Sequence, residues 1–227
     1  MSVIYLVRHG QASLFSADYD LLTPLGEEQA SILGTALNHR KFAPSAVVGG
    51  SLKRHIQTKD GYLAAQMFEM DMSVVPAWNE YDHQELLVKH NALFTDFEAI
   101  GAHIIKSEVP LKELQKILND AMWDWIHNKH SYTKTWEQFK ADVWEALNEL
   151  GSTLQKDQDA IVFTSGGPIS AVMMKLLNLD TQAFFDLQQR IVNTSVTKVI
   201  SGRNGLSLST FNDYSHLEHN KLLVTYR

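Results

Sequence analysis

The sequence predicts an α/β fold with a mostly parallel central sheet. Short apolar runs rich in β-branched residues take turns with stretches whose apolar residues recur at helical spacing, which is the pattern of strands joined by helices. The first run is apolar throughout, as expected of a strand that is covered on both faces. The chain has 227 residues, of which 44% are hydrophobic, so it can bury one large core, and we expect a single domain over residues 1–227.

The first strand, predicted at residues 3–7, ends in Arg8, His9 and Gly10. Ligands of open α/β sheets bind beyond the carboxyl ends of the parallel strands, so this guanidinium and this imidazole stand where a substrate would be met. Gly10 has no Cβ, which lets the chain turn sharply or lets a ligand approach the backbone. For this tripeptide alone, a hydrogen-bonded core histidine is the simpler explanation of His9.

The following elements bring a second cation to the same edge of the sheet. Thr23, followed by Pro24, marks the start of a helix that runs to about Arg40. A short strand at residues 46–48 then leads through two glycines into a helix that holds Arg54. Because this helix follows the carboxyl end of its strand, Arg54 is expected near the end of the first strand.

A third strand at residues 73–75 is followed by Glu80, again at an expected carboxyl end. The stretch from about 83 to 134 differs, because it is helical rather than alternating. Within it, Pro110 opens a helix whose apolar residues keep the spacing of a buried stripe. We predict that this stretch is a helical cap insertion, after which a capping box at Thr135 opens the next long helix.

The last part of the chain returns to strands. A buried strand at residues 160–163 turns through Ser165 and Gly166 into a helix that begins near Pro168. Such a junction points amide groups and the positive end of a helix dipole at whatever lies above the sheet, which favours anions. Two more strands, joined by an Asn-Gly hairpin turn, are expected at residues 196–200 and 206–211.

Composition excludes several classes of function. The 26 acidic and 20 basic residues give a formal charge of −6, which argues against nucleic-acid binding as the main role. The chain has no cysteine, so disulfides, thiolate metal sites and a cysteine nucleophile are excluded. It lacks a secretory leader pattern and a long apolar run, so we expect a cytoplasmic protein with no membrane partner.

Together the strand ends favour a phosphate site. Arg8 and Arg54 can each hold phosphate oxygens in bidentate fashion, and the helix N-terminus near Gly166 adds amide donors. The imidazole of His9 could attack phosphorus and become a phosphohistidine, while a carboxylic acid protonates the leaving alkoxide. Glu80 is the best-placed acid in the sequence.

These residues belong to motifs whose order and spacing are more specific than any one of them. The motifs are Leu-Val-Arg-His-Gly at residues 6–10, Leu-Thr-Pro-Leu-Gly-Glu-Glu-Gln-Ala at 22–30, Ser-Leu-Lys-Arg at 51–54 with Thr58, then Glu80, Ser-Gly-Gly-Pro-Ile at 165–169 and Asn-Thr-Ser-Val-Thr at 193–197. Together they cover most of the chain outside the insertion. In this set the sequence resembles the histidine phosphatase superfamily, the phosphoglycerate-mutase-like proteins.

The resemblance implies a role for each main residue. His9 would be the nucleophile that is phosphorylated, Arg8 and Arg54 would bind the phosphoryl group, and Glu80 would be the proton donor. It also implies a three-layer α/β/α sandwich that needs no metal and no other cofactor. The sequence itself agrees with the expected absence of a metal, since it has no residues with the ligand spacing of a zinc or magnesium site.

One position departs from the family pattern. The second catalytic residue of the family is a histidine directly before Gly-Gly, whereas this chain has Ser165 there. Serine is a neutral donor, while histidine can also carry charge, and losing one such contact costs about 3 kcal/mol of transition-state stabilisation. Either Ser165 donates while His83 or His216 supplies the imidazole, or the chain is a slow phosphatase, or it binds a phosphorylated ligand without turnover. A structural or surface role is nevertheless the simpler expectation for His83 and His216, and equally for His55, His103, His127, His130 and His219.

We therefore expect a metal-independent phosphomonoester phosphatase whose partner is a phosphorylated small molecule or inorganic phosphate. Retention of Glu80 argues against a pure binding protein, and residues 11–13 lack the pattern of the glycolytic mutases. A homodimer through a sheet edge or the Trp-rich helices stays open, although core burial explains the same residues. The substrate-binding candidates, each of which could instead stabilise a loop, are Gln11, Ser13, Gly166 and Asn193.

Overall fold

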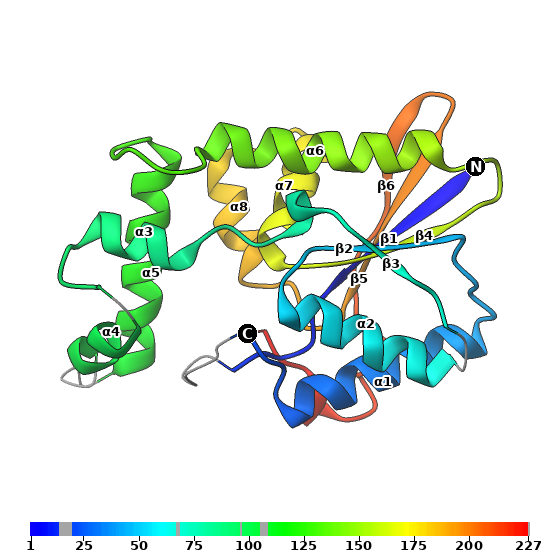
Figure 1. Cartoon of the computed structure of the whole chain (residues 1–227), viewed down its shortest axis with the longest axis horizontal. Coiled ribbons are helices and arrows are strands. Elements are labelled where there is room, and N and C mark those ends of the chain that lie inside the picture. The colour runs from blue at the N-terminus through cyan, green and yellow to red at the C-terminus, as the bar shows by residue number, and fades with distance from the viewer. Residues whose placement is uncertain (14–19, 67–68, 96, 105–108, 227) are drawn as a thin grey trace. The chain divides into compact units, whose positions relative to one another are not determined.

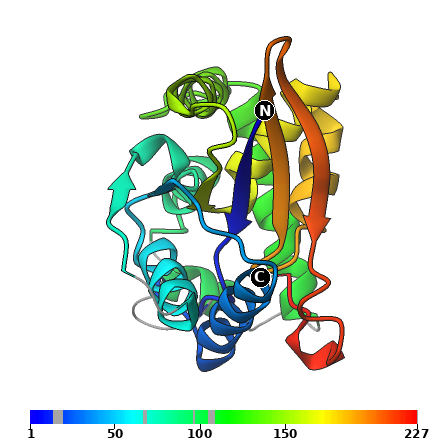
Figure 2. The same ribbon diagram turned by 90° about the vertical axis from the view of Figure 1, so that its right-hand side faces the viewer.

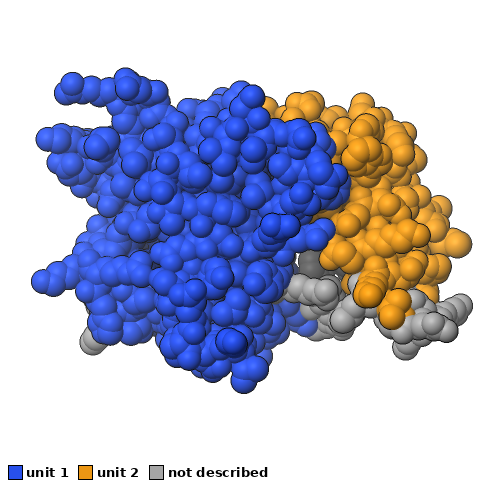
Figure 3. All heavy atoms as spheres, turned by 180° about the vertical axis from the view of Figure 1, so that it is seen from behind, with its two compact units in different colours: residues 1–80, 142–227 blue, residues 81–141 orange. Residues whose placement is uncertain are grey.

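The computed structural model describes residues 1–13, 20–66, 69–95, 97–104 and 109–226. By its internal contacts the chain divides into two compact units, which Figure 3 shows in different colours. The first unit combines Met1–Glu80 with Asp142–Arg227, and the second consists of Tyr81–Ala141. Every predicted site residue belongs to the first unit. Among the helices of the described ranges, none is long and apolar enough to cross a membrane.

A six-stranded sheet forms the centre of the first unit, with the strand order β3-β2-β4-β1-β5-β6 (Figure 1). The parallel pairs are β1 with β4, β2 with β4 and β2 with β3, whereas β5 is antiparallel to both β1 and β6. Only β5 therefore runs against the others, and the predicted mostly parallel sheet is confirmed. The strands are β1 (Ser2–Arg8), β2 (Ala46–Gly49), β3 (Met72–Val74), β4 (Ala160–Thr164), β5 (Val196–Gly202) and β6 (Gly205–Asp213).

Helices cover both faces of this sheet, as Figures 1 and 2 show. On one face, α1 (Pro24–His39) and α2 (Lys53–Gln66) pack against each other and against the strands. On the other face lies α7 (Gly166–Leu177), which contacts β1, β6 and α8 (Thr181–Gln188). The result is the three-layer α/β/α sandwich that the resemblance implied. One buried core cluster joins the α1 and α2 face to the sheet and contains Val7, Leu33, Leu37, Val47, Tyr62, Leu63, Ile161, Phe163 and Val196.

The second unit is helical. It contains α3 (His83–His90), α4 (Phe97–Ile104) and α5 (Pro110–Ile126), and α6 (Trp136–Thr153) begins in it. Trp125 is almost fully buried and packs its ring against Tyr81, Trp136 and Phe139, so the Trp-rich pattern marks a core of this unit. The helical character expected for residues 83–134 is confirmed. That this helical stretch acts as a cap and selects the substrate stays a prediction.

Two helices differ from expectation. Helix α7 begins at Gly166, before Pro168, because proline is tolerated in the first turn, where its missing N–H has no intrahelical partner to lose. Helix α8 was not predicted. It is only two turns long, and its signal is the Asp180 side chain, which accepts a hydrogen bond from the amide of Ala183. The remaining short turns are η1 (Pro76–Trp78) and η2 (Lys221–Leu223).

The capping box predicted at the start of α6 is present. The amide of Gln138 donates to Thr135 Oγ1 at 3.2 Å, and the amide of Thr135 donates to Gln138 Oε1 at 2.9 Å. We expect Thr135→Ala to lower the free energy of unfolding by about 1 kcal/mol in urea titrations, since the amide of Gln138 loses its side-chain acceptor. Thr35→Ala is the control, because that exposed hydroxyl only bonds back to Ser31 within α1. An equal loss in both variants would contradict a specific capping role.

Candidate active site

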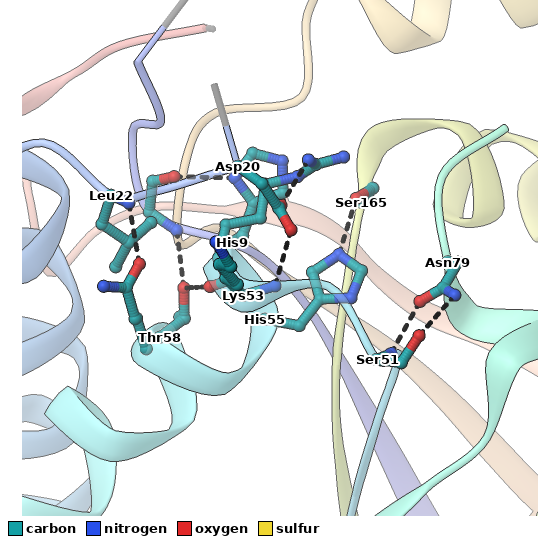
Figure 4. Close-up of polar contacts among 12 residues, drawn as sticks. His9, Asp20, Leu22, Ser51, Lys53, His55, Thr58, Asn79 and Ser165 are labelled. Atoms are coloured by element: carbon teal, nitrogen blue, oxygen red, sulfur yellow. Dashed lines mark hydrogen bonds and ion pairs between the residues drawn. The ribbon is translucent and has the colours of Figure 1, made fainter. Parts of the chain in front are cut away.

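The candidate site lies at the carboxyl ends of three neighbouring strands in the first unit. His9 directly follows β1, Arg54 and His55 stand in the first turn of α2 just after β2, and Ser165 joins β4 to α7. Figure 4 shows His9, His55 and Ser165 grouped there, with Asp20 beside them. The parallel register that places Arg8 opposite Thr164 brings these loops to one edge. His9, Arg54, His55 and Ser165 are all buried there.

His9 is held as a neutral imidazole with a defined tautomer. Its Nδ1 lies 2.7 Å from the carbonyl oxygen of Gly10, which can only accept, so Nδ1 carries the proton and Nε2 keeps its lone pair. Burial holds the pKa of His9 well below its usual value, and the cations of Arg54 and Arg8 act in the same direction. A buried imidazole with a free Nε2 lone pair is a competent nucleophile at neutral pH.

The backbone of His9 is fixed from both sides. Its amide donates to the carbonyl oxygen of Thr164 at 2.9 Å, and its own carbonyl oxygen accepts from Asn193 Nδ2 at 3.0 Å. Asn193 is fully buried, and its Oδ1 accepts from the Thr225 hydroxyl at 2.9 Å. In this arrangement Asn193 positions His9, and its role as a substrate contact stays a prediction.

Two guanidiniums flank the imidazole. The Nη1 of Arg54 forms an ion pair with Asp20 Oδ1 at 2.7 Å, while Asp20 Oδ2 accepts from the amide of Lys53 at 2.8 Å. The Nη1 of Arg8 donates to the carbonyl oxygens of Ile191 and Tyr226. The side chains of both arginines are therefore held by acceptors of the protein itself.

Glu80 lies at the N-terminus of α7. Its Oε2 accepts a hydrogen bond from the amide of Gly167 at 3.1 Å. The neighbouring Asn79 exchanges two hydrogen bonds with Ser51, at 2.7 and 2.8 Å, and so ties the loop after β3 to the loop after β2. The sequence-predicted acid is thus placed beside the glycine turn that was predicted to receive an anion.

Ser165 is the N-cap residue of α7, yet its side chain makes no capping hydrogen bond. Instead, its Oγ lies 2.7 Å from His55 Nε2 (Figure 4). A serine N-cap normally contributes about 1 kcal/mol by accepting from an amide of the first turn, so the hydroxyl gives up that stabilisation for the histidine. Both side chains are fully buried.

The histidine beside Ser165 is one to which the sequence analysis assigned only a structural or surface role. Of the two residues suggested for the missing imidazole, His83 belongs to the second unit, and His216 directs its Nε2 to the Thr194 hydroxyl at 3.1 Å. The sequence did contain a signal that points to His55. One strand end lacks a histidine before Gly166, while the next strand end has an extra one directly after Arg54.

Comparison with protein families matches residues 4–93 and 106–214 to the histidine phosphatase superfamily (branch 1). The chain belongs to this superfamily. The resemblance drawn from the motifs is thereby confirmed. The same comparison leaves the role of each residue to be tested, Ser165 above all.

Solved structures share the histidine phosphatase fold. Phosphoglycerate mutase from Bacillus anthracis superimposes with a TM-score of 0.66 at 17% identity, over 96% of this chain and 95% of that one. YhfR from Bacillus stearothermophilus gives 0.69 at 15%, over 96% and 100%. Phosphoserine phosphatase from Entamoeba histolytica, solved with phosphoserine, gives 0.64 at 14%, over 96% and 100%. At these identities the likeness shows the fold alone. A search of curated proteins found no match.

Three of the predicted substrate contacts have defined surroundings in the structure. The Oε1 of Gln11 accepts from the Thr23 hydroxyl at 2.9 Å, and the amide of Ser13 donates to the carbonyl oxygen of Leu21 at 3.0 Å. Gly166 opens α7, and a Cβ built on it would lie 3.9 Å from Arg8 Nε. The bonds of Gln11 and Ser13 stabilise the loop after β1, and their contact with substrate stays a prediction, as does that of Gly166.

Gly10 is needed for close packing of α1. A Cβ on Gly10 would lie 2.4 Å from the carbonyl oxygen of Gly26, and a Cβ on Gly26 would lie 2.2 Å from that of Gln11. Neither glycine has a positive φ. The structure thus gives a further reason for glycine at position 10, which is that the start of α1 touches the loop that carries His9, while the approach of a ligand to Gly10 stays a prediction.

His216 predicts an acid sensitivity of folding. Burial lowers the pKa of His216 to about 4. An unfolded histidine titrates near 6.5, so below that pH the unfolded chain binds the additional proton and stability falls as the pH is lowered. This residue should remove about 2 kcal/mol of unfolding free energy between pH 7 and pH 5. Urea titrations of His216→Gln should show a shallower pH dependence than wild type, with closer agreement at pH 8, and parallel profiles would refute the assignment.

Proposed function

We propose that the protein is a phosphomonoester phosphatase that acts through a phosphohistidine at His9. The observation that carries this proposal is the tautomer of His9, whose Nδ1 proton is held by the Gly10 carbonyl oxygen at 2.7 Å. Nε2 is left as a nucleophile between two arginines. A buried histidine with a purely structural role would more commonly use both ring nitrogens in hydrogen bonds.

The reaction balances with residues of this chain alone. Nε2 of His9 attacks phosphorus, the ester P–O bond breaks, and the leaving alkoxide takes a proton from the carboxylic acid of Glu80. Water then attacks the phosphohistidine, gives its proton to the Glu80 carboxylate, and releases inorganic phosphate with His9 restored. Arg8, Arg54 and the amides that open α7 supply positive charge to the phosphoryl oxygens, so we propose that no metal or other cofactor is needed.

The decisive experiment is to trap the intermediate. The protein is mixed with an aryl phosphate in the presence of a chelator, quenched in base, and analysed by mass spectrometry for a phosphate that is stable in base, labile in acid, and located on His9. Its appearance together with released phosphate supports the proposal. Heat stabilisation by phosphate without label or turnover would indicate a binding protein instead. Transfer of the label to a second alcohol would indicate a mutase.

The substrate class is proposed to be a phosphorylated small molecule. A structural neighbour was solved with phosphoserine, which is a small phosphomonoester. Because the second unit follows Glu80 directly in the chain, we propose that it acts as the cap that selects the organic part of the substrate. Turnover of a panel of phosphorylated amino acids, sugars and glycerates should then rank differently after substitutions in that unit, with aryl phosphate turnover retained.

Asp20 should compete with substrate for Arg54. Its carboxylate accepts from Arg54 Nη1 at 2.7 Å, and only 7% of the Arg54 side chain is exposed. We expect Asp20→Asn to tighten binding of inorganic phosphate by about tenfold, because the dianion no longer meets a carboxylate beside the cation. Isothermal titration calorimetry measures this, with Asp60→Asn, which alters an ion pair with Lys59 on α2, as control. Weaker binding in Asp20→Asn would show that Asp20 positions Arg54 for phosphate.

A further inference from the structure

His55 and Ser165 form a buried pair that faces the nucleophile. The Nε2 of His55 lies 2.7 Å from Ser165 Oγ, and the His55 ring centre lies 5.8 Å from that of His9. His55 comes from the first turn of α2 and Ser165 from the start of α7, so the pair joins the ends of the neighbouring strands β2 and β4. In Figure 4 the two side chains point toward each other beside His9.

The tautomer of His55 follows from its other nitrogen. Nδ1 is buried and has no hydrogen-bond partner among the described residues. A buried N–H without an acceptor is more costly than a bare lone pair, so the proton belongs on Nε2, which donates to Ser165 Oγ. The hydroxyl proton of Ser165 is then free for another acceptor. A donor chain results, from the imidazole through the hydroxyl toward the site.

Space for this imidazole is built into the loop after β2. A Cβ on Gly50 would lie 2.3 Å from Asn79 Oδ1 and 2.4 Å from His55 Nδ1, so the missing Cβ leaves room for both side chains. The hydroxyl of Ser165 also gives up its usual place as the cap of α7 in order to meet His55. Two separate features of the backbone thus accommodate the pair.

We propose that Ser165 is a catalytic residue that donates its hydroxyl proton to a phosphoryl oxygen, and that His55 is the positioning residue that polarises this hydroxyl through Nε2. This inference rests on the proposed phosphatase function and deepens it. No bond is made or broken at either residue: both hydrogen bonds shorten as negative charge grows on the phosphoryl oxygens. The imidazole that Ser165 lacks is thereby supplied from α2.

Kinetics of single and double variants test the pair. His55→Ala and Ser165→Ala should each lower kcat for an aryl phosphate by about a hundredfold, with a smaller effect on KM. The double alanine variant should be no worse than either single one, because the two groups act as a unit. Activity within about threefold of wild type in His55→Ala would overturn the proposal, as would strictly additive losses in the double variant.

The reciprocal exchange separates catalysis from packing. Ser165→His alone should lower turnover, because a second ring meets the His55 ring in a fully buried place. His55→Ser combined with Ser165→His keeps the total side-chain volume and moves the imidazole to the start of α7, so kcat should return to within about tenfold of wild type. A gain in rate from Ser165→His alone, or no recovery in the exchange although it folds, would overturn the proposal.

The matched control is His216→Gln, which alters another largely buried histidine bonded to a hydroxyl in the first unit. It should change stability and leave kcat near that of wild type. Thermal unfolding of every variant establishes that each is folded at the assay temperature. Equal losses of kcat in His216→Gln and His55→Ala would assign both to general disruption of the fold and would overturn the proposal.

A second readout does not depend on turnover. The ring nitrogens of His55 are followed by nitrogen-15 NMR while vanadate, a phosphoryl mimic, is added. Protonation on Nε2 and a vanadate-induced shift that disappears in Ser165→Ala support the donor chain. If the wild type hydrolyses nothing but these shifts occur, the phosphatase function fails and the phosphoryl-binding role of the pair stands. A proton on Nδ1, or no shift although vanadate binds, overturns the pair.

Discussion

His9→Ala should lose at least about a thousandfold in turnover of an aryl phosphate while remaining folded, because removing a covalent nucleophile removes the first chemical step. The imidazole occupies a buried site, so its removal leaves a small polar cavity rather than a broken core. Initial rates should be measured between pH 5 and pH 8 in the presence of a chelator. The depressed pKa of His9 predicts that the wild type keeps its activity at pH values below the usual titration range of histidine.

The matched control is His39→Ala, which removes an exposed histidine at the end of α1. Its turnover should equal that of the wild type. Residual activity of His9→Ala within tenfold of the wild type, in protein free of contaminating phosphatase, would mean that water attacks the ester directly. Arg8 and Arg54 would then act as a phosphate clamp without covalent catalysis.

Gly26→Ala should destabilise the protein by about 3 kcal/mol and lower activity with it. The added Cβ would lie 2.2 Å from the carbonyl oxygen of Gln11 and 2.9 Å from its amide nitrogen, both of which are backbone atoms that cannot rotate away. Relief would require α1 to move from the loop that carries His9. Urea unfolding measures the stability, and kcat at low temperature, where the variant stays folded, measures the displacement of the nucleophile.

Gly101→Ala provides the comparison, since Gly101 lies in α4 and a Cβ there would meet nothing within 4 Å. Alanine favours helix over glycine by about 1 kcal/mol, so this variant should be as stable as the wild type or more so. A similar loss in both variants would mean that glycine flexibility, and not the contact with the His9 loop, explains the effect at Gly26.

The sequence was sufficient to predict that the residues of the candidate site would follow the carboxyl ends of the strands. Buried parallel strands place the residues that follow them at one edge, and His9, Arg54, Glu80 and Ser165 each directly follow or lie close to such a strand. The strand order and the register, in contrast, were not predicted, because they depend on contacts between strands that are distant in the sequence. Local signals such as the Thr135 capping box were equally reliable, because both partners lie within one helical turn.

Contacts between distant segments could not be predicted in the same way. The pairing of His55 with Ser165 spans 110 residues, and that of Arg54 with Asp20 joins a helix to a loop. Both pairs depend on how side chains from distant segments pack together. The spacing of apolar residues along the sequence does not encode that packing. The reason for Gly10 was missed for the same cause, since the atom that excludes its Cβ belongs to Gly26.

The contact of Arg8 with Tyr226 has a consequence for the biosynthesis of this protein. The guanidinium and the carbonyl oxygen that accepts from it are separated by 218 residues, and Gln29 likewise donates to the carbonyl oxygen of Leu223. During translation Arg8 and His9 therefore emerge from the ribosome long before the segment that orients the Arg8 guanidinium. In a nascent chain α1 and α2 can pack together early, whereas the orientation of Arg8 by the Tyr226 carbonyl oxygen must wait until that later segment has left the exit tunnel.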